Sequence, residues 1–273
     1  MIALYLSDSN RPNADLPGEV PQAMRAVPRA GIAKAARRPA RYGMLAPVTE
    51  VANAALTDLE REILAPGGGL DRLRLVRTPF VPEVRLHLAE DAIVWWARME
   101  AHAGRHLPPP YWASVWAGGQ ALARYLLDHP ELAAGRRVLD LAAGSGLVAI
   151  AAALAGARRV VANDIDPYAV AAVTVNARAN RVTVAATGGD LLDTDGAGVD
   201  LLVAGDVFYD APLAARMRAF LHRVAATGAD VLVGDPGRGH LPAGLTVVAD
   251  YPVPTTEPSV DSPVRRVQVL RPR

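Results

Sequence analysis

The stretch RRVLDLAAGSGLVAIAAALAGARRVVANDIDP, residues 136–167, places an apolar run, a glycine-rich turn, an alanine-rich run and a second apolar run in succession. Short apolar runs bounded by turn residues are typical of strands buried on both faces, and the run between them has the length of a helix. A strand, a helix and a second strand in this order join parallel strands. The stretch therefore predicts an α/β domain built on a parallel sheet.

The same alternation continues toward the C-terminus. It predicts helices over 167–179 and 211–225 and strands over 182–187, 199–206 and 229–235. Two final strand patterns, at 245–251 and 265–270, have no helix between them. Because parallel strands need a crossover connection, this last pair predicts an antiparallel hairpin that closes a mostly parallel sheet.

The chain before residue 131 has a different pattern. Helices are predicted over 56–64, 91–103 and 116–127, and a strand is predicted over 84–90. We interpret residues 53–130 as an N-terminal cap of helices and a strand, and residues 131–273 as the core.

Residues 1–52 show no helical or strand period, so we expect a disordered N-terminal extension. Its arginine-rich, acid-poor stretch MRAVPRAGIAKAARRPARYG, residues 24–43, is also compatible with a transit peptide. A composition rich in alanine and arginine, with Lys34 as the single lysine, is typical of GC-rich bacterial genomes. This composition favours a cytoplasmic location over a mitochondrial one.

Composition excludes several classes of protein. The 273 residues include no cysteine, which excludes disulfides, thiol catalysis and cysteine-ligated metals. The formal net charge is +1, which gives no indication of a nucleic-acid or acidic-membrane partner. No apolar run reaches the roughly 18 residues of a membrane helix, and the N-terminus lacks a secretory signal pattern. We expect a soluble protein that binds neither nucleic acid nor membrane.

A candidate ligand site lies at the carboxyl ends of the first core strands. Gly144 and Gly146 allow the backbone to approach a ligand, and the helix that follows offers unpaired N–H groups. Asp140, at the end of the first strand, would repel a pyrophosphate but would tolerate a sulfonium. Asp164 is placed to bind ribose hydroxyls, and Asp190 is placed to accept from an adenine amino group. Three carboxylates suit a cationic nucleoside, S-adenosylmethionine, better than NAD.

Each observation leaves an alternative open. An aspartate between a strand and a helix is often only a helix cap, and for Asp166, just before Pro167, the cap is the favoured interpretation. The turn GSGLVA, residues 144–149, also satisfies the dinucleotide fingerprint, which keeps an NAD(P)-dependent oxidoreductase as an alternative.

The motifs together resemble the electron-transfer flavoprotein β-subunit lysine methyltransferases, a branch of the seven-strand class I methyltransferases. The resemblance extends over residues 79–271 and rests on LDLAAGSG, ANDIDP, GDVFYD, GDPGR and PYWASVWAGGQALARYLLDHPEL. It implies a Rossmann-like seven-strand sheet, S-adenosylmethionine as the cofactor, no metal, and the flavoprotein β-subunit as a protein substrate. Ala142 stands where the class usually has the first glycine of its turn. The implied cofactor contacts are Trp112, Trp116, Asp140, Ala142, Gly144, Gly146, Asp164, Ile165, Asp190 and Gly205.

The aromatic segment before the first core strand would cover the methionine end of the cofactor, according to the same resemblance. Trp112 and Trp116 would then wall that pocket and contact the sulfonium through their ring faces. Packing of an amphipathic helix is the alternative for both residues. Gly118 and Gly119 would keep the pocket floor open, or would simply begin the helix.

The motif GDVFYD places Asp206 at the end of the fourth core strand and Tyr209 just beyond it. We expect Asp206 to bind and orient a lysine ammonium, with action as a base left open, and Tyr209 to bond the amine or shape its channel. A helix cap and plain packing are the respective alternatives. In GDPGR, Asp235 and Arg238 are expected on the substrate rim, where Arg238 would steer an acidic surface or form a surface ion pair.

The same motifs are compatible with functions other than lysine methylation. The same cofactor could serve a ribosomal-protein amine or a nicotinamide-like small molecule, and a non-catalytic cofactor-binding module is a further alternative. His102 and His106 have the spacing of metal ligands on a helix, but the sequence offers no third ligand, so we expect no metal.

Overall fold

The computed structural model describes residues 50–65, 69–196, 198–254 and 264–272. Within them, a seven-stranded sheet has the order β5-β4-β3-β6-β7-β9-β8. The strands are β3 (Arg137–Leu141), β4 (Arg159–Asp164), β5 (Ala185–Gly188), β6 (Leu201–Gly205), β7 (Asp230–Asp235), β8 (Leu245–Pro254) and β9 (Val264–Pro272). Strands β3 to β7 are parallel, whereas β9 runs antiparallel to both β7 and β8. The Rossmann-like fold with a closing hairpin is confirmed.

Strand β3 lies between β4 and β6, and this position locates the site. The chain leaves β3 toward β4 and β5 on one side and returns to form β6 and β7 on the other side. Ligands of open α/β sheets bind beyond the carboxyl ends of the strands at such a reversal of strand order. The turn after β3 and the loops after β4, β5 and β6 all lie at this edge.

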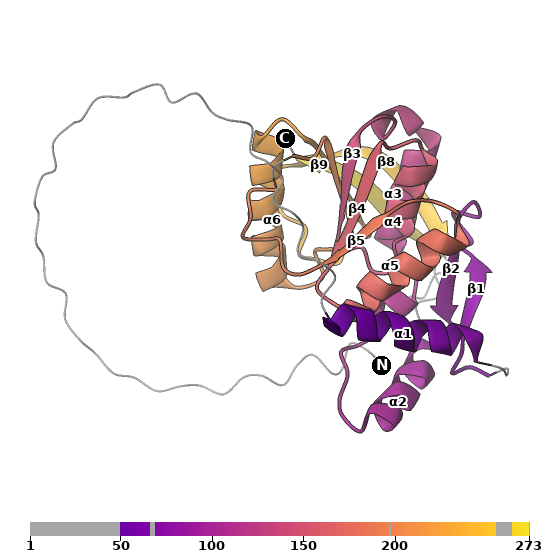
Figure 1. Cartoon of the computed structure of the whole chain (residues 1–273). Helices are drawn as coiled ribbons and strands as arrows, with labels where there is room; N and C mark the ends of the chain where they lie inside the picture. Colours follow the sequence, from indigo (N-terminus) through magenta and orange to yellow (C-terminus); the bar gives the residue numbers. More distant parts are fainter. Residues whose placement is uncertain (1–49, 66–68, 197, 255–263, 273) are drawn as a thin grey trace, which may run out of the picture.

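Helices cover both faces of the sheet (Figure 1). Helices α3 (Ala117–Asp128), α4 (Leu147–Leu154) and α5 (Pro167–Ala179) lie on one face, and α6 (Ala211–Ala226) lies on the other. Strands β3 and β4 alternate their buried side chains between the two cores: Val138 and Val160 face the three helices, whereas Leu139 and Val161 belong to the cluster with α6. The parallel strands therefore read as continuous apolar runs because both of their faces are covered.

The N-terminal part forms a separate layer against α5. It contains α1 (Glu50–Leu64), β1 (Leu73–Arg77), β2 (Arg85–Ala89) and α2 (Ala92–Ala103), with β1 and β2 paired antiparallel. Asn176 of α5 and Asn180, the C-cap residue of that helix, accept hydrogen bonds from the backbone N–H groups of His87 and Arg85. These two side chains provide hydrogen-bond partners for backbone N–H groups on the edge of β2 that does not pair with β1, and they fix the strand to the domain.

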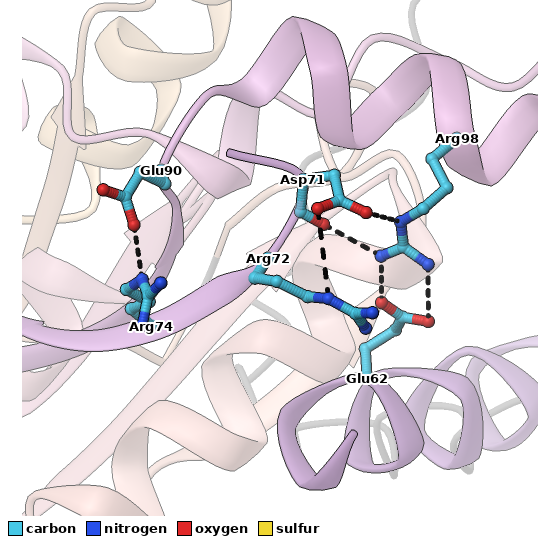
Figure 2. Close-up of polar contacts among 6 residues, drawn as sticks. All are labelled: Glu62, Asp71, Arg72, Arg74, Glu90 and Arg98. Carbon is cyan, nitrogen blue, oxygen red and sulfur yellow. Dashed lines mark hydrogen bonds and ion pairs between the residues drawn. The ribbon is translucent and has the colours of Figure 1, made fainter. Parts of the chain in front are cut away.

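A group of charged side chains joins the pieces of this layer, as Figure 2 shows. Arg98 of α2 donates from Nη1 to Glu62 Oε1 of α1 at 3.2 Å, and its Nε lies 2.9 Å from Asp71 Oδ2. The Arg98 side chain is only 18% exposed, so its guanidinium is largely shielded from water. The arginine ties both N-terminal helices to the segment that leads into β1.

Several predicted boundaries differ from the structure. The strand expected over 182–187 is β5 at Ala185–Gly188, and the helix expected from residue 56 begins at Glu50. Strand β1 was not predicted, because its sequence LRLVR alternates poorly and buries only Leu73. Disorder was expected over residues 1–52, but residues 50–52 belong to α1, so the expectation is wrong for these three residues. Residues 1–49 lie outside the described residues, and the division at residues 52 and 130 stays a prediction. None of the described helices combines the length and apolar character that a membrane crossing requires.

Candidate functional site

The turn between β3 and α4 winds through left-handed backbone conformations. Gly144 and Gly146 have φ of +52° and +81°, and Ala142 has φ of +55°. A side chain at Gly146 would meet Val173 Cγ2 of α5 at 3.2 Å, and one at Gly144 would come within 3.8 Å of the Trp112 backbone. Ala142 therefore occupies a position that favours glycine, at a cost of about 1–2 kcal/mol.

Asp164, at the end of β4, holds this turn. Its Oδ2 accepts from the Gly144 N–H at 2.9 Å and its Oδ1 accepts from the Asp166 N–H at 3.0 Å. Burial raises the pKa of this carboxyl against those hydrogen bonds. Since a carboxylate has about four lone-pair positions, it retains acceptors for two ribose hydroxyls.

Ile165 and Asp166 follow with different roles. The Ile165 side chain is 76% exposed beside Asp164, where an apolar base could cover it. Asp166 accepts from the Tyr168 N–H at 2.8 Å and begins α5, so its expected role as a cap is confirmed.

Asp140 lies in the interior. Its side chain is 1% exposed, and its Oδ2 accepts from the backbone N–H of Ala149, the third residue of α4. Gly146, at the N-cap position of that helix, has no side chain to accept a hydrogen bond. The carboxylate of Asp140 on β3 acts as the cap instead. Burial raises the pKa of Asp140 to about 8. The cap interpretation fits this geometry, and a contribution to binding a cation stays a prediction.

Asp190, the third expected carboxylate, is engaged on the surface. Its Oδ1 accepts from the Leu192 N–H at 2.9 Å, and its Oδ2 pairs with Arg216 of α6 at 2.9 Å. These two hydrogen bonds hold the pKa of Asp190 below its usual range. An adenine amino group would therefore share this carboxylate with Arg216.

The two tryptophans have different environments. Trp112 is 2% exposed and packs edge-on against Trp95 at 5.2 Å, inside the N-terminal cluster, so the packing interpretation fits its side chain. Trp116 is half-buried, and its Nε1 donates to the Tyr111 carbonyl at 2.7 Å. Tyr111 lies between Trp116 and Tyr209, with ring centroids 5.8 and 6.4 Å away. We call Tyr111, Trp116 and Tyr209 the aromatic rim.

Four glycines bring α3 against the ends of β6 and β7, and we call them the glycine contact. A Cβ on Gly118 would lie 2.6 Å from Asp206 Oδ2, and a Cβ on Gly205 would lie 2.8 Å from the Gly119 backbone. Gly234 meets Gly118 in the same way. Gly118 and Gly205 therefore serve helix packing, which corrects the interpretation of Gly118 as an open pocket floor. A cofactor contact through the Gly205 backbone stays a prediction.

Asp206 lies directly after β6 in a left-handed conformation, with φ of +56°. The residue is 9% exposed, and its Oδ2 accepts from the Gly119 N–H at 2.9 Å. Its Oδ1 lies 3.4 Å from Arg238 Nη2. Burial raises the pKa of Asp206 to about 6, against the opposing effect of the arginine charge. The residue combines backbone strain, burial and charge, a combination that is concentrated at functional sites.

Asp235 and Arg238, from the motif GDPGR, lie beside Asp206 rather than on an exposed rim of the site. Asp235 is 1% exposed, and its Oδ1 accepts from the Gly237 N–H at 2.6 Å, so its expected place on the rim is wrong. Arg238 packs over the Trp116 ring at 5.3 Å and pairs with Asp206. Its ion pair is therefore internal to the site. Tyr209 is 52% exposed and open to an acceptor.

The residues at this edge fit S-adenosylmethionine. The turn after β3 places backbone close to the ligand space, Asp164 has lone pairs for hydroxyls, and Ile165 offers an exposed apolar surface. Asp206 and the aromatic rim provide negative charge and ring faces, both of which suit a cation. The described residues contain no group of three or more histidines, cysteines, aspartates or glutamates arranged to hold a metal. His106 instead lies 3.2 Å from Glu100.

Comparison with known proteins identifies the family. A profile described as "Ribosomal protein L11 methyltransferase (PrmA)" matches residues 120–206. The electron transfer flavoprotein beta subunit lysine methyltransferase of Danio rerio is 43% identical over 172 residues, which cover 62% of this chain and 66% of that protein. Its counterpart from Rattus norvegicus is 41% identical over 181 residues, covering 63% of this chain and 70% of that protein. The chain belongs to this flavoprotein lysine methyltransferase family.

Membership in the flavoprotein lysine methyltransferase family confirms the resemblance of the motifs and decides against the oxidoreductase alternative. The chain spans 66% and 70% of the length of the two relatives. Among solved structures, the T. thermophilus 16S rRNA N2 G1207 methyltransferase in complex with AdoMet and guanosine aligns with a TM-score of 0.49. It is 21% identical, and the alignment covers 77% of this chain and 52% of that chain.

Sequence reasoning missed two residues of this family member's site. Tyr111, adjacent to Trp112 in PPPYW, forms the middle of the aromatic rim, and its place directly after three prolines is the signal that could have indicated it. Arg216 pairs with Asp190 from the middle of α6, where nothing in the local pattern distinguishes it from other surface arginines.

Proposed function

We propose that the protein is an S-adenosylmethionine-dependent lysine N-methyltransferase whose acceptor is the electron-transfer flavoprotein β-subunit. The observation that carries the proposal is the place of Asp206: a buried carboxylate beside the aromatic rim, on the same sheet edge as the glycine turn and Asp164. The names of the two relatives support the choice of acceptor.

The cofactor supplies an electrophilic methyl group, so the protein has mainly to align an amine. A lysine amine has a pKa near 10.4, whereas the pKa of Asp206 is raised only to about 6. Moving the proton from the ammonium to Asp206 would cost about 6 kcal/mol at these values. Asp206 therefore binds and orients the ammonium, and the proton leaves to water before the amine attacks.

The aromatic rim completes the acceptor position. Tyr111 and Tyr209 are 38% and 52% exposed, so their rings are accessible to a side chain that enters from solvent. A cation over an exposed ring face gains about 0.5–1 kcal/mol, and more when water is excluded. Burial raises the pKa of Tyr209, so its hydroxyl stays neutral. Its oxygen can accept a hydrogen bond from an N–H of the amine, which leaves the nitrogen lone pair free to attack the methyl group.

Labelled S-adenosylmethionine tests the proposal with three acceptors in parallel: the purified flavoprotein, ribosomal protein L11 and nicotinamide. We expect label in the flavoprotein β-subunit alone. Label in L11 with none in the flavoprotein would overturn the acceptor, and this second candidate is favoured by the profile match over residues 120–206. Absence of label from all three would overturn the lysine methyltransferase assignment.

We also propose that the protein acts in the cytoplasm, supported by the alanine- and arginine-rich composition. Fractionation of the source cells, with the protein detected by antibody, tests this location. Recovery in a membrane or organelle fraction would contradict it.

A further inference from the structure

The guanidinium of Arg238 lies between a carboxylate and an aromatic face. Its Nη2 is 3.4 Å from Asp206 Oδ1, and its Cζ is 5.3 Å from the centroid of Trp116. The side chain is 20% exposed. Arg238 thus has the two partners that a lysine ammonium would seek at this edge of the sheet, an anion and a ring.

The charges around Asp206 allow another cation to take the place of Arg238 in this ion pair. The charged groups that face it are Asp235, the last residue of β7, and Arg238, in the loop after that strand, and α3 contributes the Gly119 N–H. The 3.4 Å separation between Asp206 and Arg238 is long for a charge-assisted hydrogen bond. The pair is weak enough for a second cation to compete with it.

A second carboxylate is available in the same loop. Asp235 is 1% exposed, and its Oδ2 has no hydrogen-bond partner in the described part of the chain. An unpaired buried carboxylate oxygen is costly, and a guanidinium that turned toward it would relieve that cost. Arg238 lies three residues beyond Asp235, within the reach of its long side chain.

We propose that Arg238 occupies the place of the acceptor ammonium in the ligand-free protein, and that an entering lysine displaces its guanidinium from Asp206 toward Asp235. This inference rests on the proposed lysine methylation. It makes Arg238 a specificity-determining residue, because a neutral acceptor would break the Arg238–Asp206 pair without replacing its charge. A cationic side chain replaces that charge.

Binding measurements on the full chain test the exchange without requiring turnover. A peptide that contains the acceptor lysine, and its counterpart with norleucine, are titrated calorimetrically into protein saturated with S-adenosylhomocysteine. Because the charge of Arg238 lowers the pKa of Asp206, its removal should raise that pKa, so the titrations are run at pH 8.5, well above the value of about 6 in the wild type. We expect Arg238→Gln to bind the lysine peptide about fivefold more tightly than the wild type. Arg266→Gln, a surface control whose side chain is 81% exposed, should leave binding unchanged.

The outcomes separate the two proposals. Equal or weaker binding of the lysine peptide by Arg238→Gln, in a wild type that prefers lysine over norleucine, overturns the exchange and leaves the proposed function standing. A wild type that binds both peptides equally overturns lysine recognition and the exchange with it. If Arg238→Gln lowers the unfolding temperature, Arg238→Lys provides the same test, with a smaller gain expected because the charge remains.

A double-mutant comparison tests the part assigned to Asp235. Asp235→Asn should weaken lysine-peptide binding about threefold in the wild-type background, since the displaced guanidinium loses its acceptor, and should have no effect in the Arg238→Gln background. Equal weakening in both backgrounds would assign Asp235 a purely structural role and would overturn the proposed destination of Arg238.

Discussion

The Oδ2 atom of Asp206 lies 2.9 Å from the backbone nitrogen of Gly119, which donates a hydrogen bond to it. Gly119 is the third residue of α3, and the side chain of the N-cap residue, Trp116, makes no capping hydrogen bond to that helix. Asp206 therefore caps a helix that comes from another part of the chain, and the helix holds the carboxylate in place. Because helix N-termini attract negative charge, the same contact favours the ionised form of Asp206.

Two substitutions of Asp206 separate the effect of its negative charge from its role as a cap of α3. Asp206→Asn keeps an oxygen for the Gly119 N–H and tolerates the left-handed backbone, so stability should change little. Because the substitution removes the charge, kcat/KM for a lysine acceptor should fall about 10- to 100-fold. Asp206→Ala should in addition lower the free energy of unfolding by about 1–2 kcal/mol, through loss of the cap. Steady-state kinetics and thermal unfolding measure these effects. An Asn variant with full activity would contradict the role of the charge.

The glycine contact predicts opposite effects at two adjacent residues. Gly118→Ala would place its Cβ 2.6 Å from Asp206 Oδ2, so α3 must move and the free energy of unfolding should fall by about 1–3 kcal/mol. Gly119→Ala meets only Val148 Cγ2, at 3.9 Å, and should be neutral or stabilising by up to about 1 kcal/mol. Chemical denaturation of both variants decides the point. Equal destabilisation of the two would argue against close packing as the cause.

Binding of a lysine peptide should depend on pH through Asp206. The pKa of Asp206 is raised to about 6, so the carboxyl is neutral below that pH and ionised above it, and affinity for the ammonium should rise as the pH increases from 5 to 7. Titration of the peptide into the complex with S-adenosylhomocysteine measures this without the rise in rate that comes from deprotonating the amine. The Asp206→Asn variant should show a flat profile, and a sloping one would assign the titration to another group.

Two neighbouring aspartates are expected to differ in their effect on the cofactor. Asp164→Asn removes charged acceptors from the position assigned to the ribose, and the affinity for S-adenosylhomocysteine should fall about 10-fold or more. Asp166→Asn keeps a good cap on α5 and should bind as the wild type does. Calorimetry compares the two, and unchanged affinity in Asp164→Asn would place the nucleoside elsewhere.

Much of the fold could be predicted from the sequence because its parallel strands are buried on both faces and therefore read as plain apolar runs. The aspartates at strand ends were found for the same reason: Asp164 and Asp206 each directly follow a recognisable run. Sequence pattern is also sufficient for the cap at Asp166, since capping is a local interaction. Family membership then confirmed the resemblance that the motifs indicated.

The rest depended on contacts between distant parts of the chain. Gly119 and Asp206 are 87 residues apart, and no local pattern connects them. The packing of Trp112 against Trp95 on α2 is another such contact, and the place of Trp112 at the cofactor stays a prediction. Arg238 and Asp235 appeared as surface residues, because a sequence does not show how closely α3 approaches the ends of β6 and β7.

Mass mapping of the flavoprotein after incubation with S-adenosylmethionine shows whether the protein methylates a lysine through Asp206. We expect methyl groups on the ε-amine of a lysine in the β-subunit with the wild-type protein, and strongly reduced modification with Asp206→Asn. An unmodified β-subunit, or equal modification by both proteins, would contradict this expectation.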